Sequence, residues 1–90
     1  MSIVNIFTVY NSPGGVQMER PMYIKRMRDL REDSDYSQAY VAERLGTSQT
    51  MYARYERGAN ELPIRHLLAL CELYGVSADY LLGRTDRKNP

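Results

Sequence analysis

The sequence SQAYVAERLGTSQTMYARYERG, residues 37–58, predicts two short helices joined by a tight turn. Ser37 and Ser48 are good helix N-caps, and apolar residues follow each of them at helical spacing. Gly46 and Gly58 are expected to end the two helices, because only glycine adopts the left-handed C-cap conformation without steric cost. The turn between the helices is about three residues long, which is typical of a helix-turn-helix unit.

The second predicted helix has two chemically different faces. Tyr52 and Tyr55 lie three residues apart and are expected to be buried. The opposite side carries an amide, a hydroxyl and two guanidinium groups around one small residue: Gln49, Thr50, Ala53, Arg54 and Arg57. Glutamine and arginine can form bidentate hydrogen bonds with adenine and guanine in the major groove, which admits an α-helix. Alone, such a face is typical of a solvated helix, but behind a helix and a tight turn it favours contact with DNA.

These motifs together resemble the helix-turn-helix of the phage repressor family (Cro/C1, Xre-like) of bacterial and phage DNA-binding proteins. The matching features are Ser37-Gln38, Val41-Ala42, Leu45-Gly46, Tyr52, Tyr55-Glu56 and Gly58. The similarity continues through LRED in the preceding helix, ELP at 61–63 and YGVSADYLLGRTD at 74–86. The resemblance implies an all-α, five-helix, lambda-repressor-like domain whose third helix enters the major groove.

The chain divides into an extension at 1–21, the helix-turn-helix domain at 22–84 and a polar tail at 85–90. Residues 3–10 are rich in β-branched and aromatic residues, and a turn-forming cluster follows at 11–15. The extension is either a strand that pairs with a second subunit, an arm packed over the helices, or a poorly ordered segment. Its apolar run is too short for a membrane span and lacks a basic leader, so we expect no signal peptide or anchor.

Composition fits one small soluble domain, with 90 residues of which 43% are hydrophobic and 26% charged. The net charge of +1 is weak evidence against non-specific coating of DNA, but it does not exclude local basic patches. The one cysteine, Cys71, rules out an internal disulfide and fits the reducing cytoplasm, which is the expected location.

Other positions are assigned to the architecture. In the family, an arginine at the position of Arg31 pairs with the glutamate that corresponds to Glu56, and such a bidentate pair would fix the first helix (22–32) against the third. Lys25, Arg26 and Arg28 are expected to be largely solvated. The core residues expected near the C-terminal end are Ile64, Leu67, Leu68, Leu70, Cys71, Tyr74, Tyr80, Leu81 and Leu82.

The candidate DNA contacts fall into two groups. The expected base-contacting residues are Gln49, Thr50 and Arg54. The expected backbone-contacting residues are Gln38, Thr47, Ser48, Arg57, Asn60 and Arg44. The resemblance implies that Gln38 bonds a phosphate and braces the third helix, and the free N–H groups at a helix start are compatible with this role.

Enzymatic motifs are absent from the sequence, which lacks a Gly-rich phosphate loop and HExxH and has one histidine, His66. Without a second His or Cys at ligand spacing we expect no metal site, and we expect no cofactor. The expected function is that of a sequence-specific transcriptional regulator, a repressor, acting as a homodimer on a pseudo-palindromic operator in double-stranded DNA. The alternatives are an antitoxin that also masks a toxin, and a protein-interaction module that has lost DNA binding.

Overall fold

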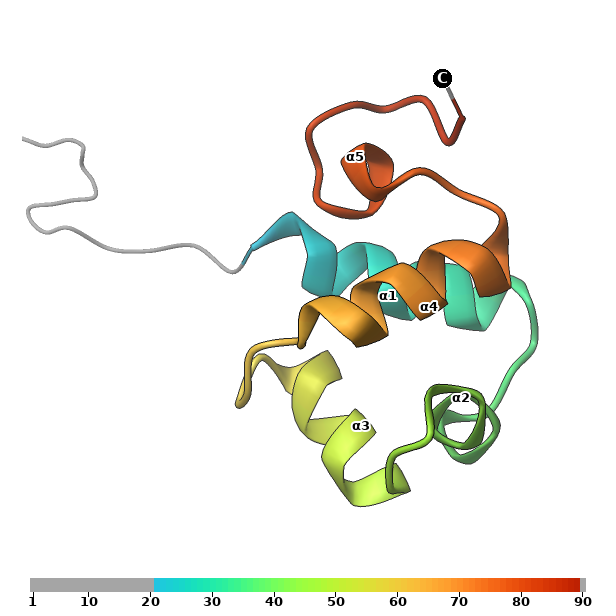
Figure 1. Cartoon of the computed structure of the whole chain (residues 1–90), viewed down its shortest axis with the longest axis vertical. Helices are drawn as coiled ribbons and strands as arrows, with labels where there is room; N and C mark the ends of the chain where they lie inside the picture. Colours follow the sequence, from blue (N-terminus) through green and yellow to red (C-terminus); the bar gives the residue numbers. More distant parts are fainter. Residues whose placement is uncertain (1–20, 90) are drawn as a thin grey trace, which may run out of the picture.

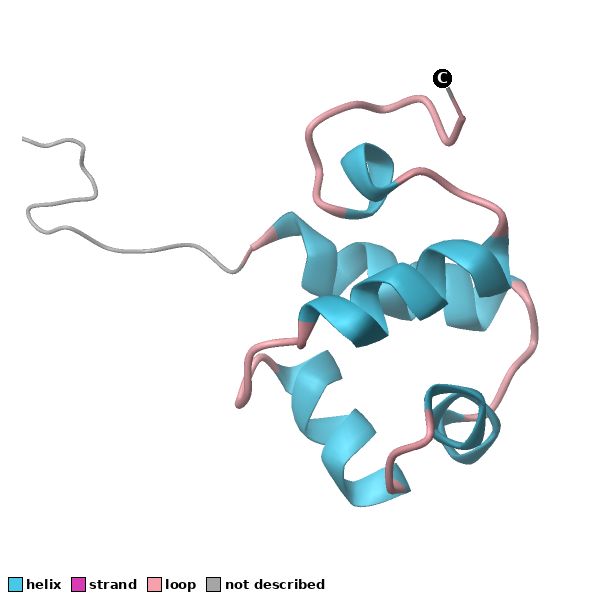
Figure 2. Cartoon of the chain, viewed as in Figure 1, coloured by secondary structure: helices cyan, strands magenta, loops and turns pink. Residues whose placement is uncertain are grey.

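The computed structural model describes residues 21–89, and these residues form helices and loops without a strand (Figure 2). The helices are α1 (Met22–Asp33), α2 (Gln38–Leu45), α3 (Gln49–Arg57), α4 (Ile64–Tyr74) and α5 (Ala78–Leu81). The predicted all-α architecture with five helices is therefore confirmed for this part of the chain. The expectations for residues 1–20, a strand, an arm or a poorly ordered segment, lie outside the described residues.

The helices are arranged so that α1 and α4 cross the middle of the molecule, with α2 and α3 on one side and α5 on the other (Figure 1). Helix α3 packs on α1 and α2, α4 packs on α2 and α5, and α5 packs on α1. Each helix contributes one large, fully buried side chain to the core: Met27, Val41, Tyr52, Leu70 and Leu81. The core therefore ties all five elements together, which fixes the position of the short helix α3.

Local signals set the helix ends as predicted. The Ser37 and Ser48 hydroxyls accept hydrogen bonds from the third backbone N–H beyond them, at 3.0 and 3.1 Å. Gly58 ends α3 in the left-handed conformation with φ 75°. A Cβ atom there would lie 2.9 Å from Ile24 Cδ1, so α1 approaches this turn closely. Glycine is thus required at Gly58 both by the backbone conformation and by the packing of α1.

Three residues expected in the core are exposed instead. Ile64, Leu68 and Leu82 retain 73%, 55% and 42% of their accessible surface. Helix α4 turns His66 and Leu70 inward, and the His66 ring lies 5.8 Å from the ring of Tyr55. The apolar arc of α4 is wider than the surface that its neighbours cover, so one edge of the arc remains in contact with solvent.

Arg26 was expected to be solvated, but its side chain is only 13% exposed. It donates hydrogen bonds of 2.6 Å to the carbonyl oxygens of Tyr80 and Thr85 and one of 2.9 Å to the Asp86 carboxylate. Its guanidinium also lies 4.1 Å from the centre of the Tyr80 ring. The backbone N–H of Ser77 donates to the Lys88 carbonyl at 2.8 Å. The polar segment after α5 is therefore held against α1 and α5.

Replacing Arg26 by alanine is expected to lower the free energy of unfolding by about 1.5–3 kcal/mol, because charged hydrogen bonds to two carbonyl oxygens are lost. Urea unfolding followed by circular dichroism measures this change. The matched control is Lys25→Ala, since Lys25 forms an exposed pair with Asp29 and should contribute only about 0.3–0.5 kcal/mol. Equal losses for the two variants would contradict the anchoring role of Arg26.

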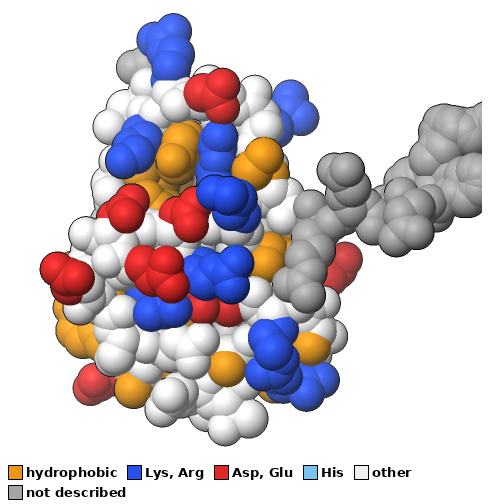
Figure 3. Space-filling view, turned by 180° about the vertical axis from the view of Figure 1, so that it is seen from behind, with side chains coloured by type: hydrophobic (Ala, Val, Ile, Leu, Met, Phe, Trp, Pro, Cys, Tyr) orange, Lys and Arg blue, Asp and Glu red, His pale blue; other side chains and the backbone are white. Residues whose placement is uncertain are grey.

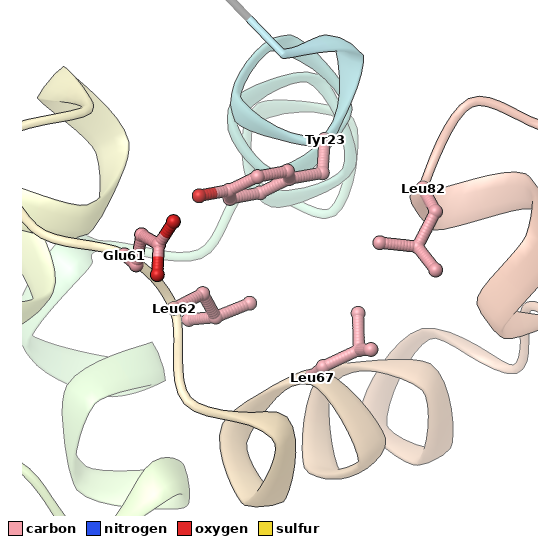
Figure 4. Close-up of a pocket in the computed structure, with 5 residues that line it drawn as sticks. All are labelled: Tyr23, Glu61, Leu62, Leu67 and Leu82. Atoms are coloured by element: carbon pink, nitrogen blue, oxygen red, sulfur yellow. The ribbon is translucent and has the colours of Figure 1, made fainter.

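A small apolar pocket of about 200 Å³ lies apart from the helix-turn-helix unit (Figure 4). Its lining comes from α1, the loop before α4, α4 itself and the end of α5: Tyr23, Glu61, Leu62, Leu67 and Leu82. The polar side-chain groups among these lining residues are the Glu61 carboxylate and the Tyr23 hydroxyl, and the other three are leucines. None of the helices within residues 21–89 has both the length and the apolar character that a bilayer crossing requires.

Candidate nucleic-acid interface

The α2–turn–α3 unit presents the N-terminal end of α3 at the surface. Gly46 ends α2 with φ 76°, and the Thr47 backbone N–H donates to the Ala42 carbonyl at 2.9 Å. Ser48 then caps α3, so the turn between the helices occupies residues 46–48. The Gly46 N–H donates to the Glu43 carbonyl at 3.0 Å and the Met51 N–H to the Ser48 hydroxyl at 3.1 Å, so local hydrogen bonds close both sides of this tight turn.

Helix α3 has the two faces that its sequence predicted. Tyr52 and Tyr55 are buried in the core. The side chains placed together on the outer face are Gln49, Thr50, Arg54 and Arg57, and all four are exposed. In the rear view, basic side chains gather at the lower right, on the side of the molecule where α3 lies (Figure 3). The outer face of α3 therefore offers amide, hydroxyl and guanidinium groups to a partner.

The predicted backbone-contacting residues are in different states. Ser48 and Arg57 are exposed, and Thr47 is half-buried. Arg44 donates a hydrogen bond of 2.8 Å to the Tyr40 hydroxyl, within the exposed surface of α2. Asn60 accepts a hydrogen bond of 2.6 Å from Arg54 Nε. The structure therefore brings one predicted backbone contact, Asn60, onto one predicted base contact, Arg54.

Glu56 is the centre of a buried hydrogen-bond network beneath α3. Arg31 donates to both of its carboxylate oxygens, from Nε at 2.7 Å and from Nη2 at 3.1 Å. The Tyr52 hydroxyl donates to Oε2 at 2.6 Å, and the Gln38 amide donates to Oε1 at 3.1 Å. Side chains of α1, α2 and α3 therefore converge on one carboxylate, and Arg31 also donates to the Tyr36 carbonyl at 3.0 Å.

Electrostatic interactions keep Arg31 and Glu56 charged within this network. Burial alone would raise the pKa of Glu56, but hydrogen bonds from Arg31, Tyr52 and Gln38 hold that pKa below its usual value. The hydrogen bond to Glu56 raises the pKa of Arg31. Burial raises the pKa of Tyr52, and its hydrogen bond to Glu56 raises that pKa further. The phenol therefore stays protonated and remains a donor. The pair is thus charged at neutral pH and orients α3 from beneath.

Gln38 braces α3, as the family resemblance implies, because its amide donates to Glu56 on that helix. Its expected contact with a phosphate stays a prediction. A primary amide has two N–H donors, so one donor of Gln38 remains for an anion. Tyr52 was assigned only to the core, although its spacing of four residues from Glu56 is the spacing of a helical side-chain pair.

Two titratable residues outside the Glu56 network, Cys71 and His66, are at least half-buried. Among residues 21–89 no three His, Cys, Asp or Glu side chains are placed to hold a metal ion. Burial raises the pKa of the Cys71 thiol, and burial lowers the pKa of His66. Both groups are therefore favoured in their neutral forms, as expected for packing residues.

Known proteins share this fold and sequence pattern. A family model described as "Helix-turn-helix" matches residues 27–81. The chain is 38% identical over 69 residues to YobD of Bacillus subtilis (strain 168), an uncharacterized HTH-type transcriptional regulator, covering 77% of this chain and 62% of YobD. It is 33% identical over 55 residues to RstR, a cryptic phage CTXphi transcriptional repressor of Vibrio cholerae, covering 61% of this chain and 50% of RstR. The chain thus spans less than two thirds of the length of these relatives.

Solved structures agree with these sequence matches. The P22 c2 repressor, in complex with synthetic operator 9T, superposes with a TM-score of 0.63 at 30% identity, covering 70% of this chain and 96% of that one. The N-terminal DNA binding domain of SinR from Bacillus subtilis gives a TM-score of 0.60 at 27% identity, with 68% and 90% covered. The chain belongs to the helix-turn-helix family of Cro/C1-type, Xre-like regulators.

Proposed function

We propose that this protein is a sequence-specific DNA-binding transcriptional regulator that acts as a repressor. The observation that carries this proposal is the exposed face of α3, where amide, hydroxyl and guanidinium groups stand on a helix held from beneath by Glu56. The relatives named as transcriptional regulators and repressors support it. The similarity to a repressor solved on its operator supports entry of α3 into the major groove.

In this proposal the contacts divide by chemistry. Base edges are contacted by Gln49, Thr50 and Arg54, because amide and guanidinium groups match adenine and guanine. The DNA backbone is contacted by the polar and basic groups around the unit: Gln38, Thr47, Ser48, Arg57, Asn60 and Arg44. The domain acts by binding rather than by catalysis and uses no cofactor.

A homodimer is part of the proposal, because one short helix contacts only a few base pairs. Two copies of α3 on a pseudo-palindromic site, separated by about 34–36 Å, would supply both affinity and specificity. Selection of bound sequences from a random duplex library, at low salt, tests this arrangement. A motif with two related half-sites supports the dimer, and a single half-site supports a monomer. Absence of any enriched motif would leave a protein-binding role, which the SinR protein/SinI protein complex exemplifies in a similar fold.

Two arginines on α3 should respond differently to removal. Arg54→Ala is expected to weaken operator binding by about 1–3 kcal/mol and to relax the choice of base at one position. Arg57→Ala should weaken all sequences similarly and reduce the slope of log K against log salt by about 0.9. Fluorescence anisotropy on operator and random duplexes at several salt concentrations measures both effects. Equal loss on operator and random DNA for Arg54→Ala would refute its base-contacting role.

A further inference from the structure

Arg54 is held in the free protein by a residue beyond its own helix. Its Nε–H donates to Asn60 Oδ1 at 2.6 Å, and six positions of the chain separate the two residues. Arg54 is exposed, whereas Asn60 is half-buried. An exposed arginine ordinarily samples many rotamers, so a fixed acceptor at Nε restricts the direction in which its guanidinium points.

The backbone after α3 brings Asn60 to this position. Gly58 takes the left-handed conformation, and the Ala59 backbone N–H donates to the Arg54 carbonyl at 2.9 Å. The chain therefore folds back over the last turn of α3. Ile24 of α1 packs on the same turn, since a Cβ at Gly58 would come within 2.9 Å of its Cδ1. The segment that carries Asn60 is thus packed against α1 at Gly58.

The bond leaves the recognition end of the guanidinium unused. An arginine side chain donates from Nε and from its two terminal nitrogens in one planar fork. Asn60 occupies Nε–H, and neither terminal NH₂ group bonds another residue in the described part of the chain, so both can bond the O6 and N7 atoms of a guanine. The amide of Asn60 is neutral, so it orients Arg54 without cancelling the positive charge that DNA attracts.

We propose that Asn60 is a positioning residue that presents Arg54 end-on to a guanine of the target site. This inference rests on the proposed DNA-binding function and replaces the expectation that Asn60 contacts a phosphate. The two roles use different atoms of the same amide. Positioning uses the oxygen as an acceptor, whereas a phosphate contact uses the NH₂ group as a donor.

The test compares Asn60→Ala with Asn60→Asp in the full chain, on the selected operator and on duplexes that replace the base pair opposite Arg54. Asn60→Ala removes the acceptor and is expected to weaken operator binding by about 3–10-fold, with little change on the replaced duplexes. Asn60→Asp keeps the acceptor oxygen and loses the donor. It should therefore keep the preference for guanine while it weakens every duplex by charge repulsion.

Double substitution isolates the pair. In an Arg54→Ala background, Asn60→Ala should have no further effect on binding, because the residue acts only through Arg54. In the DNA-free protein, Asn60→Ala should shift the ¹⁵Nε resonance of Arg54, and Arg57→Ala should leave it in place. Thermal unfolding of each variant confirms that the domain is folded.

Uniform weakening of all duplexes by Asn60→Ala, with a smaller salt slope, would assign Asn60 to a phosphate and overturn the proposal. An unchanged Arg54 resonance would overturn it without any DNA. Failure of the proposed function is separately visible, because the unmodified protein would then select no motif. That result would contradict both the guanine contact of Arg54 and the positioning role of Asn60.

Discussion

Replacing Glu56 by alanine is expected to lower the free energy of unfolding by about 3–5 kcal/mol, since a buried pair then loses one partner. Arg31 would be left with a largely buried charge, and the buried Tyr52 hydroxyl would lose its acceptor. Small domains are stable by only about 5–15 kcal/mol, so a large share of the stability would disappear. Urea unfolding at pH 7, followed by circular dichroism, measures the loss.

The control for this result is Asp29→Asn, which breaks the exposed pair with Lys25 and should change stability by less than about 0.5 kcal/mol. The double replacement Arg31→Met with Glu56→Leu removes both charges together. It should be less destabilising than the two single losses combined, because no unpaired charge remains. Strict additivity of the two single changes would show that Arg31 and Glu56 do not act as a pair.

The free energy of unfolding is expected to depend on pH through the Glu56 carboxylate. The folded-state pKa of Glu56 is lowered from its usual 4.5, so its ionised form adds stability that is fully present above that value. This contribution is lost as the pH falls from about 4.5 through the lowered folded-state pKa. Glu56→Gln should lack this component. His66 affects stability at higher pH than Glu56 does. Burial lowers the pKa of His66 from 6.5, so its contribution to stability is lost as the pH falls below that value.

Leu70→Ala is expected to destabilise the protein by about 2–5 kcal/mol, because it opens a cavity in the centre of the core. Leu70 has no exposed surface, whereas Leu68, on the same helix, is 55% exposed. Leu68→Ala is therefore a matched control, with the same change of side chain and an expected loss below about 1 kcal/mol. Similar losses for the two variants would contradict the observed orientation of α4, in which Leu70 faces the core and Leu68 faces solvent.

The sequence predicted the elements that depend on local signals. Ser37 and Ser48 cap their helices, and glycines end them, because these interactions involve residues close together in the chain. The separation of buried Tyr52 from exposed Arg54 followed from helical periodicity alone. The helix ends and the exposed face of α3 could therefore be predicted from local signals, whereas the five-helix fold was implied by the resemblance to a known family.

Features that depend on distant neighbours could not be predicted in this way. Periodicity marks Leu68 and Leu70 alike as apolar, but only the packing of α2 and α5 on α4 determines which one is covered. Arg26 looks no different from Lys25 in the sequence, yet its partners Tyr80 and Thr85 follow more than fifty positions later. The bond between Arg54 and Asn60 likewise depends on the fold-back at Gly58.

The Glu56 network has an evolutionary consequence. Arg31, Gln38 and Tyr52 meet this carboxylate beneath α3, whereas the outer face of that helix contributes nothing to the network. Under the proposed function, mutations on the outer face can therefore alter the preferred DNA target without destabilising the fold. Because the proposed role of Asn60 acts through Arg54, these two residues would be exchanged together, while the Glu56 network stays constant.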